Sequence, residues 1–250
     1  MTDRDFSDHF SRDSSGYGRH RPHYPSALFA YLAGVAPSCD RVWDCATGSG
    51  QATAGLATHF SEVIATDASA AQIAEAVAAQ RVDYRVRTAE DSGLEADSVD
   101  LITVAQALHW FDLHAFAAES ARVLKPGGLI AAWTYNLLHV TPSLDTVIDR
   151  FYHDVLGGYW PPGRELVEAS YRGLDLPFSE LACPSFEMTE DWTFDRLLGY
   201  LETWSAAKRY EDRNGEKPVE FSYEALRDAW GDPARSWRVA WPLTVRVWTP

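Results

Sequence analysis

The sequence has few cysteines and no long apolar run. Its three cysteines, Cys39, Cys45 and Cys183, show neither the paired spacing of a metal site nor a disulfide framework, so we expect reduced thiols. No stretch approaches the roughly 20 apolar residues that a membrane-spanning helix needs. The polar N-terminus does not resemble a signal peptide. These absences predict a cytoplasmic protein with no membrane partner.

Basic residues are also scarce. Lysine and arginine number 22 against 36 acidic residues, which gives a net charge of −14. A nucleic-acid substrate requires a basic surface to meet its phosphates, so this balance disfavours nucleic acid and favours a small-molecule partner. With 250 residues, 46% of them hydrophobic, the chain can form one α/β domain with additions, or one domain and a small satellite.

The stretch 41–51, which reads RVWDCATGSGQ, is the most informative part of the sequence. It predicts a strand that ends abruptly and leads into the first turn of a helix. Gly48 and Gly50 allow backbone conformations closed to larger residues and let a ligand approach the main chain. A lone turn of this kind is also compatible with a plain tight turn, so its neighbours decide its meaning.

A second apolar strand, 63–67, ends in Asp67. An acidic residue at this place can accept hydrogen bonds from ribose hydroxyls, which favours a nucleotide-like ligand. A nicotinamide site prefers a small residue three positions after the second glycine, where this chain has the β-branched Thr53. Thr53 therefore disfavours a nicotinamide cofactor.

Strands and helices alternate through the first half of the chain. We expect five strands, at 41–45, 63–67, 84–87, 99–104 and 129–133, with intervening helices that include an alanine-rich one from Ser69 to about Gln80. This alternation predicts a parallel sheet with right-handed crossovers, and ligands bind such sheets at the carboxyl ends of the strands. Beyond residue 135 we expect an amphipathic helix at 143–156, strands at 185–189 and 241–248, and helices from 193 and at 222–230.

Several segments together resemble the class I S-adenosylmethionine-dependent methyltransferases. They are DCATGSG at 44–50, Asp67, AED at 89–91, QALHWFD at 106–112 and RVLKPGG at 122–128. The N-terminal segment 17–25 and the His-Trp-Phe-Asp segment are most similar to small-molecule methyltransferases of the type 11 kind related to trans-aconitate methyltransferase. The resemblance covers residues 17–135. It departs at Ala46, where the family usually has its first glycine.

The resemblance implies a Rossmann-like α/β fold with a mostly parallel seven-stranded sheet flanked by helices. It implies four segments: an N-terminal arm and capping helix at 1–36, a cofactor-binding core at 37–135, a helical substrate-cover insertion at 136–182, and C-terminal strands and helices at 183–250 that complete the sheet. The implied cofactor is S-adenosyl-L-methionine, with S-adenosyl-L-homocysteine as product, and no metal.

The resemblance also assigns residues to parts of the cofactor. The methionine portion is expected among Asp44 and the backbone of Ala46, Thr47, Gly48 and Gly50. The adenosine portion is expected among Asp67 at the ribose, Ala68 at the adenine face, and Glu90 or Asp91, more readily Asp91, at the adenine edge. Gln106 and His109 are expected beside the cofactor, and Arg21 and Tyr24 meet its carboxylate or the substrate if the N-terminal arm closes.

Each of these residues has a plainer alternative role. Asp67 could cap the helix that begins at Ser69. Glu90 and Asp91 could be solvated loop charges, His109 a packed residue beside Trp110, and Arg21 a surface cation. The sequence alone does not decide between these roles and the binding roles.

The expected reaction is in-line transfer of a methyl group to a small acceptor, for which the protein mainly aligns the reactants and excludes water. A carboxylate acceptor is already ionised and needs only a cation or donor such as Arg21, His139 or Arg164. A hydroxyl or amine acceptor needs a base, for which His109 is the candidate. The alternatives are a nicotinamide-dependent oxidoreductase and a non-catalytic module that binds the same cofactor. The sequence leaves the acceptor and the oligomeric state open.

Overall fold

The computed structural model describes residues 21–250. Within that range the first half of the chain alternates helices and strands as the apolar pattern predicts. The elements are α2 (Ser26–Val35), β1 (Arg41–Cys45), α3 (Thr53–Leu56), β2 (Glu62–Asp67), α4 (Ala70–Glu75), β3 (Val82–Val86), β4 (Val99–Ala105), the 3₁₀-helix η1 (Leu108–Trp110), α5 (Leu113–Val123) and β5 (Leu124–Thr134). Asp112 caps α5 by accepting hydrogen bonds from the backbone amides of His114 and Ala115.

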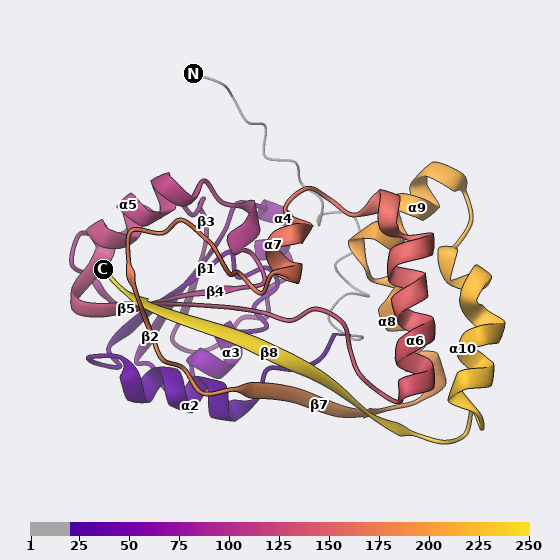
Figure 1. Cartoon of the computed structure of the whole chain (residues 1–250). Coiled ribbons are helices and arrows are strands. Elements are labelled where there is room, and N and C mark those ends of the chain that lie inside the picture. The colour runs from indigo at the N-terminus through magenta and orange to yellow at the C-terminus, as the bar shows by residue number, and fades with distance from the viewer. Residues whose placement is uncertain (1–20) are drawn as a thin grey trace.

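The second half of the chain is richer in helices. It contains α6 (Pro142–Arg150), the π-helical turn η2 (Phe151–Val155), the 3₁₀-helix η3 (Gly157–Tyr159), α7 (Arg164–Glu168), β6 (Ser179–Leu181), β7 (Phe186–Trp192), α8 (Phe194–Glu202), α9 (Ser205–Asn214), the 3₁₀-helix η4 (Pro218–Ser222), α10 (Tyr223–Trp230) and β8 (Trp237–Thr249). Figure 1 shows α6, α8, α9 and α10 gathered at the end of the molecule away from the C-terminus.

The sheet confirms the predicted Rossmann-like α/β fold. Within the described residues its strand order is β3-β2-β1-β4-β5-β8-β6, in which β1 to β5 are parallel and β8 and β6 are antiparallel to their neighbours. β7 pairs with the first part of β8, so this long strand joins the sheet to the helical end. From β1 the chain adds β2 and β3 on one side and then β4 and β5 on the other side. The connections that leave β1 and β4 therefore run in opposite directions, which places a crevice at the carboxyl end of β1.

The two faces of the sheet bury separate apolar layers. Alternate residues of each strand point to opposite faces, so Val42 packs with α2 and α3 while Trp43 packs with Phe116 of α5. Figure 1 shows α2 and α3 on one side of the sheet and α5 on the other. The apolar layer under α2 continues into the helical end, where it includes Tyr200 and Trp241. The parallel strands are therefore held from both faces, as buried parallel sheets require.

Two helices are shorter than their sequence patterns predict. α4 ends at Glu75 instead of continuing to about Gln80, and none of its residues is buried, so no packing extends it. α3 is a single turn that ends at Leu56, and Phe60 lies beyond it although its side chain is fully buried. No helix within residues 21–250 is both long and apolar enough to cross a membrane.

Candidate functional site

The glycine-containing turn after β1 has the conformation that its sequence requires. Gly48 and Gly50 have φ angles of +58° and +90°, and Ala46 has a φ of +54°. A Cβ at Gly50 would lie 2.7 Å from the Tyr84 hydroxyl, so a larger residue would displace that ring. Ala46 adopts the left-handed region that glycine occupies at lower cost, so this departure from the family pattern leaves the shape of the turn intact.

Asp44, near the end of β1, holds this turn in place through hydrogen bonds. Its carboxylate is fully buried and accepts hydrogen bonds from three threonine hydroxyls, those of Thr47 at 2.7 Å, Thr53 at 2.6 Å and Thr103 at 3.0 Å. Burial raises the pKa of Asp44, and the three hydroxyl bonds oppose that rise. Because both carboxylate oxygens are taken up by hydroxyls, Asp44 holds the turn in shape and does not face the crevice directly.

Asp67 connects the turn after β1 to the end of β2. One carboxylate oxygen accepts a hydrogen bond from the Gly48 amide at 2.9 Å, and the other accepts one from the Ser69 amide at 2.8 Å. Ser69 in turn caps α4 by accepting from the amide of Gln72. The two features that the sequence places at the centre of the site therefore lie in direct contact at the same edge of the sheet.

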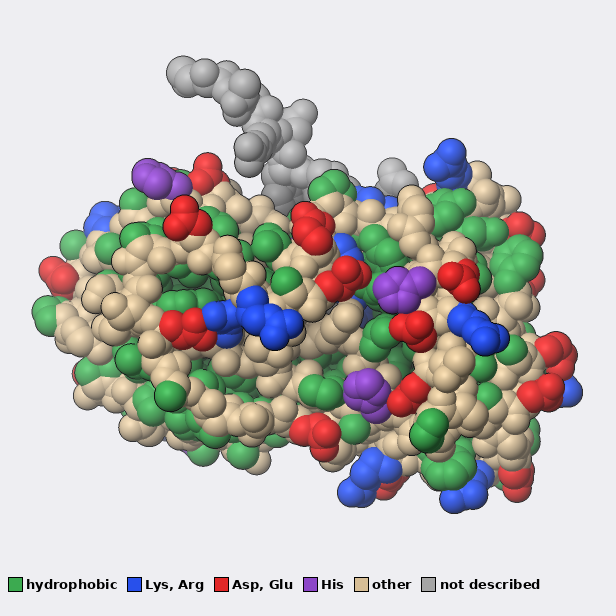
Figure 2. All heavy atoms as spheres, in the orientation of Figure 1, with side chains coloured by type: hydrophobic (Ala, Val, Ile, Leu, Met, Phe, Trp, Pro, Cys, Tyr) green, Lys and Arg blue, Asp and Glu red, His purple; other side chains and the backbone are tan. Residues whose placement is uncertain are grey.

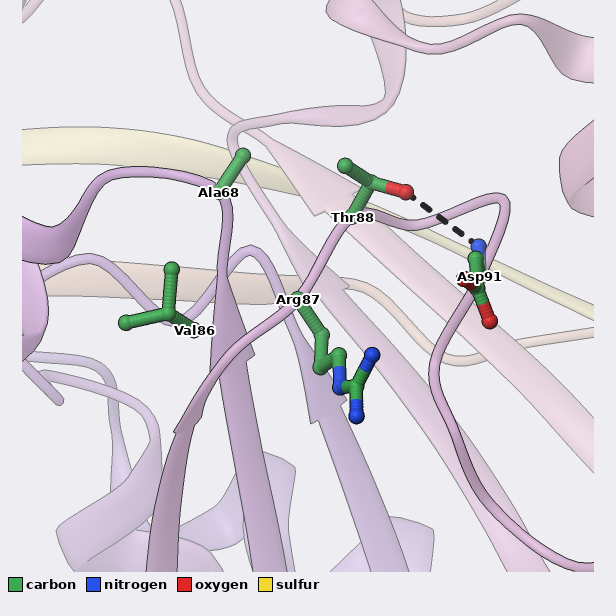
Figure 3. A pocket seen from close by; sticks show the side chains of 5 residues that line it. All are labelled: Ala68, Val86, Arg87, Thr88 and Asp91. Atoms are coloured by element: carbon green, nitrogen blue, oxygen red, sulfur yellow. Dashed lines mark hydrogen bonds between the residues drawn. The ribbon is translucent and has the colours of Figure 1, made fainter.

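A pocket of about 200 Å³ lies beside Asp67, between the ends of β2 and β3. Figure 3 shows the five residues that line it, which are Ala68, Val86, Arg87, Thr88 and Asp91. The Thr88 hydroxyl and the backbone amide of Asp91 are hydrogen-bonded at 3.2 Å, which folds the loop after β3 against the pocket.

The two neighbouring acidic residues, Glu90 and Asp91, lie in different surroundings. Asp91 lines the pocket, whereas the Glu90 carboxylate accepts a hydrogen bond from the backbone amide of Asp112 at the start of α5. Of the two carboxylates proposed for the adenine edge, the geometry favours Asp91.

Gln106 lies at the end of β4 in a bend with a φ of +58°. Its backbone amide donates to the carbonyl of Trp133, and its side-chain amide donates to the carbonyl of Tyr135. The Thr134 hydroxyl donates to its side-chain oxygen at 2.9 Å. Gln106 therefore joins the carboxyl ends of β4 and β5, next to the crevice.

His109 lies in η1, immediately after this bend. Its Nδ1 is 3.1 Å from the hydroxyl of Tyr171, a fully buried residue whose pKa is raised by burial. Burial, together with the positive charge of Arg164, lowers the pKa of His109 to about 3. A neutral imidazole that gains a proton only at pH 3 is a weak general base at neutral pH. The geometry therefore favours a packed, polar His109 over a catalytic one.

Arg21 and Tyr24 approach the end of β5. The Arg21 guanidinium donates to the Tyr135 hydroxyl at 3.4 Å and to the Thr203 carbonyl at 3.2 Å, and it lies over the ring of Tyr200. Tyr24 packs edge-on against Trp133. The part of the N-terminal arm that precedes Arg21, including Tyr17, lies outside the described residues.

Of the two other cations considered for an acceptor carboxylate, one lies in this region and one does not. Arg164 contacts Asn136, two residues beyond β5, and lowers the pKa of His109. His139 is exposed, lies beside Asp145 and pairs its backbone with Ala240. The structure therefore brings Arg164 to the carboxyl ends of the strands and leaves His139 on the outer surface.

Some residues of the site were missed by reasoning from the sequence. Thr53 and Thr103, which bind Asp44, lie too far apart in the chain for spacing to reveal them. Tyr171, the partner of His109, lies three residues after α7 in a segment without a recognisable sequence pattern. Val86 gave no signal in the sequence, because only the structure shows that its side chain is 50% exposed beside the pocket.

Comparison with known proteins identifies the family. Residues 43–132 match the model of a methyltransferase domain. A Dictyostelium discoideum protein that carries the name methyltransferase is 34% identical over 207 residues, covering 80% of this chain and 78% of that protein. An uncharacterized methyltransferase of Schizosaccharomyces pombe is 32% identical and covers 83% of both chains.

A solved structure gives the same result. A protein from Anaeromyxobacter dehalogenans, described as a type II methyltransferase, is 49% identical and superimposes with a TM-score of 0.85, covering 91% of this chain and 97% of that chain. The chain belongs to the class I S-adenosylmethionine-dependent methyltransferase family.

Proposed function

We propose that this protein transfers a methyl group from S-adenosyl-L-methionine to a small-molecule acceptor, a carboxylate or a hydroxyl, and releases S-adenosyl-L-homocysteine. The observation that carries the proposal is the hydrogen bond between the Asp67 carboxylate and the Gly48 amide. This bond supports the proposal because it joins a carboxylate at the end of β2, where ribose hydroxyls are commonly bound, to a turn whose glycines leave the main chain accessible. We propose further that the protein acts in the cytoplasm, and that its closest functional likeness is to the trans-aconitate methyltransferase group.

The residues present fit an adenosyl cofactor. A carboxylate offers about four lone-pair sites, so the Asp67 carboxylate can orient the turn and also accept ribose hydroxyls. The pocket beside it combines apolar walls, Ala68 and Val86, with the polar groups of Thr88 and Asp91. Such a mixture suits a flat heteroaromatic base with hydrogen-bonding edges. Asp44 would act indirectly, by fixing the turn through its threonine partners.

When bound, S-adenosylmethionine supplies a methyl group activated by a positively charged sulfur. The protein's task is then to hold the acceptor in line with that methyl group and to keep water away. Gln106 and the residues after β5 are placed for this task, because they border the crevice from the β4 side. No proton needs to be removed from an ionised carboxylate, and His109 is poorly suited to remove one from a hydroxyl because its pKa is about 3.

Equilibrium binding tests the proposal. We expect the purified protein to bind S-adenosylhomocysteine and not NAD in isothermal titration calorimetry. Replacing Asp67 by Ala should lower the affinity for S-adenosylhomocysteine by roughly 1–3 kcal/mol, the value of one or two hydrogen bonds to a charged group. Asp83→Ala, which removes an exposed carboxylate from the neighbouring strand β3, is the matched control and should leave the affinity unchanged.

The opposite results are equally clear. Tight binding of NAD would support a nicotinamide-dependent enzyme, and an unchanged affinity in Asp67→Ala would remove this residue from the site. Binding of S-adenosylhomocysteine without turnover of any acceptor in a panel of small acids and phenols would favour a non-catalytic module.

A further inference from the structure

Arg164 is held in an unusual way at the start of α7. Its guanidinium lies over the rings of Trp160 and Tyr152, at 4.5 Å and 5.2 Å from their centroids. Nε donates to the Tyr152 hydroxyl at 2.6 Å, and Nη2 donates to the side-chain oxygen of Asn136. These contacts fix both the plane and the direction of the guanidinium. Its remaining nitrogen, Nη1, donates to no described residue and is not sealed from solvent.

This guanidinium lacks a carboxylate partner. Among residues 21–250, no aspartate or glutamate lies within ion-pair distance of Arg164. The exposed Glu168 is linked to Arg164 through the hydroxyl of Tyr152, which donates to Glu168 and accepts from Arg164. Four other half-buried arginines each pair with a carboxylate, namely Arg41 with Glu62, Arg85 with Asp83, Arg196 with Glu190 and Arg246 with Glu180. The Arg164 guanidinium is thus held by neutral groups among the described residues, and its Nη1 edge can still pair with a ligand carboxylate.

Arg164 lies near the carboxyl edge of the sheet, so an anion bound to it would lie near the proposed site of methyl transfer. Asn136 follows β5 by two residues, at the carboxyl edge of the sheet. Gly163, the residue before Arg164, packs so closely on η1 that an added Cβ would lie 3.0 Å from the His109 carbonyl. Arg164 thus lies between the ends of β4 and β5, on the side of the crevice where an acceptor would lie if the cofactor occupies the β1 to β3 side.

The local backbone supports a binding role for this cluster. Tyr152 belongs to the π-helical turn η2, and π-helical turns occur frequently at functional sites. The turn directs the Tyr152 hydroxyl at Arg164, while Trp160 and Trp204 pack around the Tyr152 ring. The cation is therefore bordered by a wall of aromatic rings. A ligand that suits this combination has an anionic end and an apolar body.

We propose that Arg164 is a specificity-determining residue that anchors a carboxylate group of the methyl acceptor, with the partly exposed Trp160 bordering the acceptor's apolar portion and the buried Tyr152 holding Arg164 in place. The inference rests on the proposed methyltransferase function and narrows its substrate class to small carboxylic acids. Arginine suits this task because its planar fork can form two parallel hydrogen bonds with a carboxylate. In a chain with a net charge of −14, a negatively charged substrate requires such a local cation.

The test compares acids with their uncharged counterparts. The protein is saturated with S-adenosylhomocysteine and titrated calorimetrically with a fixed series of small aliphatic and aryl monocarboxylates, dicarboxylates and the primary amide of each. We expect at least one acid to bind ten or more times more tightly than its amide. Arg164→Gln should abolish this preference, and Arg164→Lys should retain part of it because the charge remains but the fork is lost.

The control variant is Arg172→Gln. Arg172 is exposed, lies in the same segment, and its guanidinium donates to the backbone carbonyl of Ala169. This variant should keep the full preference for acids, and all variants should keep the wild-type affinity for S-adenosylhomocysteine, which also reports that they fold.

Three outcomes would overturn the assignment of Arg164. They are the absence of binding by every acid, equal binding of acids and amides, and a preference for acids that survives Arg164→Gln. None of these results touches the cofactor proposal, because S-adenosylhomocysteine binding is measured separately. Failure of the protein to bind S-adenosylhomocysteine, with the preference for acids intact in titrations without it, would instead reject the proposed function and leave the anion site standing.

Discussion

At the scale of single residues, hydrogen-bond partners distinguish residues that the sequence pattern treats alike. Asp67 does accept a backbone amide at the start of α4, as its plainer alternative suggests, but it also holds the Gly48 amide across the crevice. Glu90 accepts from the loop before α5, so its neighbour Asp91 is left beside the pocket. The sequence predicted from their places after strands that these residues lie at the carboxyl edge of the sheet. It could not predict their hydrogen-bond partners, because these bonds join segments that are distant in the chain.

The half-buried His109 gives a prediction on pH dependence. The pKa of His109 is about 3 in the folded protein and about 6.5 in the unfolded chain. Between these values the unfolded state binds the additional proton, so this residue makes stability fall as the pH drops from 6.5 towards 3 and has no effect above that window. The full loss is on the order of 3–5 kcal/mol, of which about 2 kcal/mol is reached at pH 5.

Urea unfolding at pH 8 and pH 5 measures this contribution. In His109→Gln, the difference in free energy of unfolding between the two pH values should be about 2 kcal/mol smaller than in the wild type. The control is His114→Gln, which removes an exposed imidazole from α5 and should behave as the wild type. An equal pH dependence in wild type and His109→Gln would show that His109 is protonated in the folded protein at pH 5.

At the scale of elements, the strands were more predictable than the helices. The buried strands β1, β2 and β4 follow from runs of apolar residues, because both faces of a parallel sheet are covered. The early end of α4 and the π-helical turn after α6 could not be read from the sequence. The first reflects missing burial and the second a local register change, and both depend on tertiary packing.

The contact between α2 and α3 gives a prediction at this scale. Gly55 of α3 faces Phe29 of α2 so closely that an added Cβ would lie 2.1 Å from the ring. Because Phe29 is buried, Gly55→Ala should force the two helices apart and lower the free energy of unfolding by roughly 1–3 kcal/mol. Since α3 carries Thr53, which holds Asp44, the affinity for S-adenosylhomocysteine should fall as well.

A glycine in the partner helix provides the matched control. An added Cβ at Gly34 of α2 meets nothing within 4 Å, so Gly34→Ala should stabilise the protein by up to ~1 kcal/mol through helix propensity. Denaturant unfolding of the two variants in parallel therefore gives changes of opposite sign. If Gly55→Ala were as stable as Gly34→Ala, the packing of α2 on α3 would be looser than the structure shows.

At the scale of the whole molecule, the sheet and the helical end share a strand. The first part of β8 pairs with β7, and its last residues pair with β5 and β6. The sequence predicted a strand here from its alternation, but not that one strand would serve both regions, since nothing in a local pattern identifies strand partners. Figure 2 shows acidic and basic side chains interspersed on one face of the molecule, so the negative net charge is not concentrated in a single patch on that face.

A shared strand predicts that the molecule unfolds as one unit. The proposed cofactor site lies mainly at the ends of β1 to β4, whereas the helical end carries an aromatic cluster around Trp192, Trp204 and Trp241 that continues the apolar layer under α2. Because β8 belongs to both regions, stabilising one should stabilise the other. S-adenosylhomocysteine at 100 times its dissociation constant adds about 2.7 kcal/mol to the folded state. For a chain of this size that amount should raise the melting temperature by roughly 5–10 °C.

Differential scanning calorimetry with and without S-adenosylhomocysteine distinguishes the possibilities. We expect one transition in both conditions, shifted upward as a whole by the ligand, with tryptophan fluorescence following the same curve. Two transitions, of which the ligand moves only one, would mean that the helical end unfolds independently and that β8 does not transmit stability between the regions. The cofactor site would then be stabilised by its ligand without any effect on the Arg164 cluster, whose Tyr152 and Trp160 pack against Trp204 of the helical end.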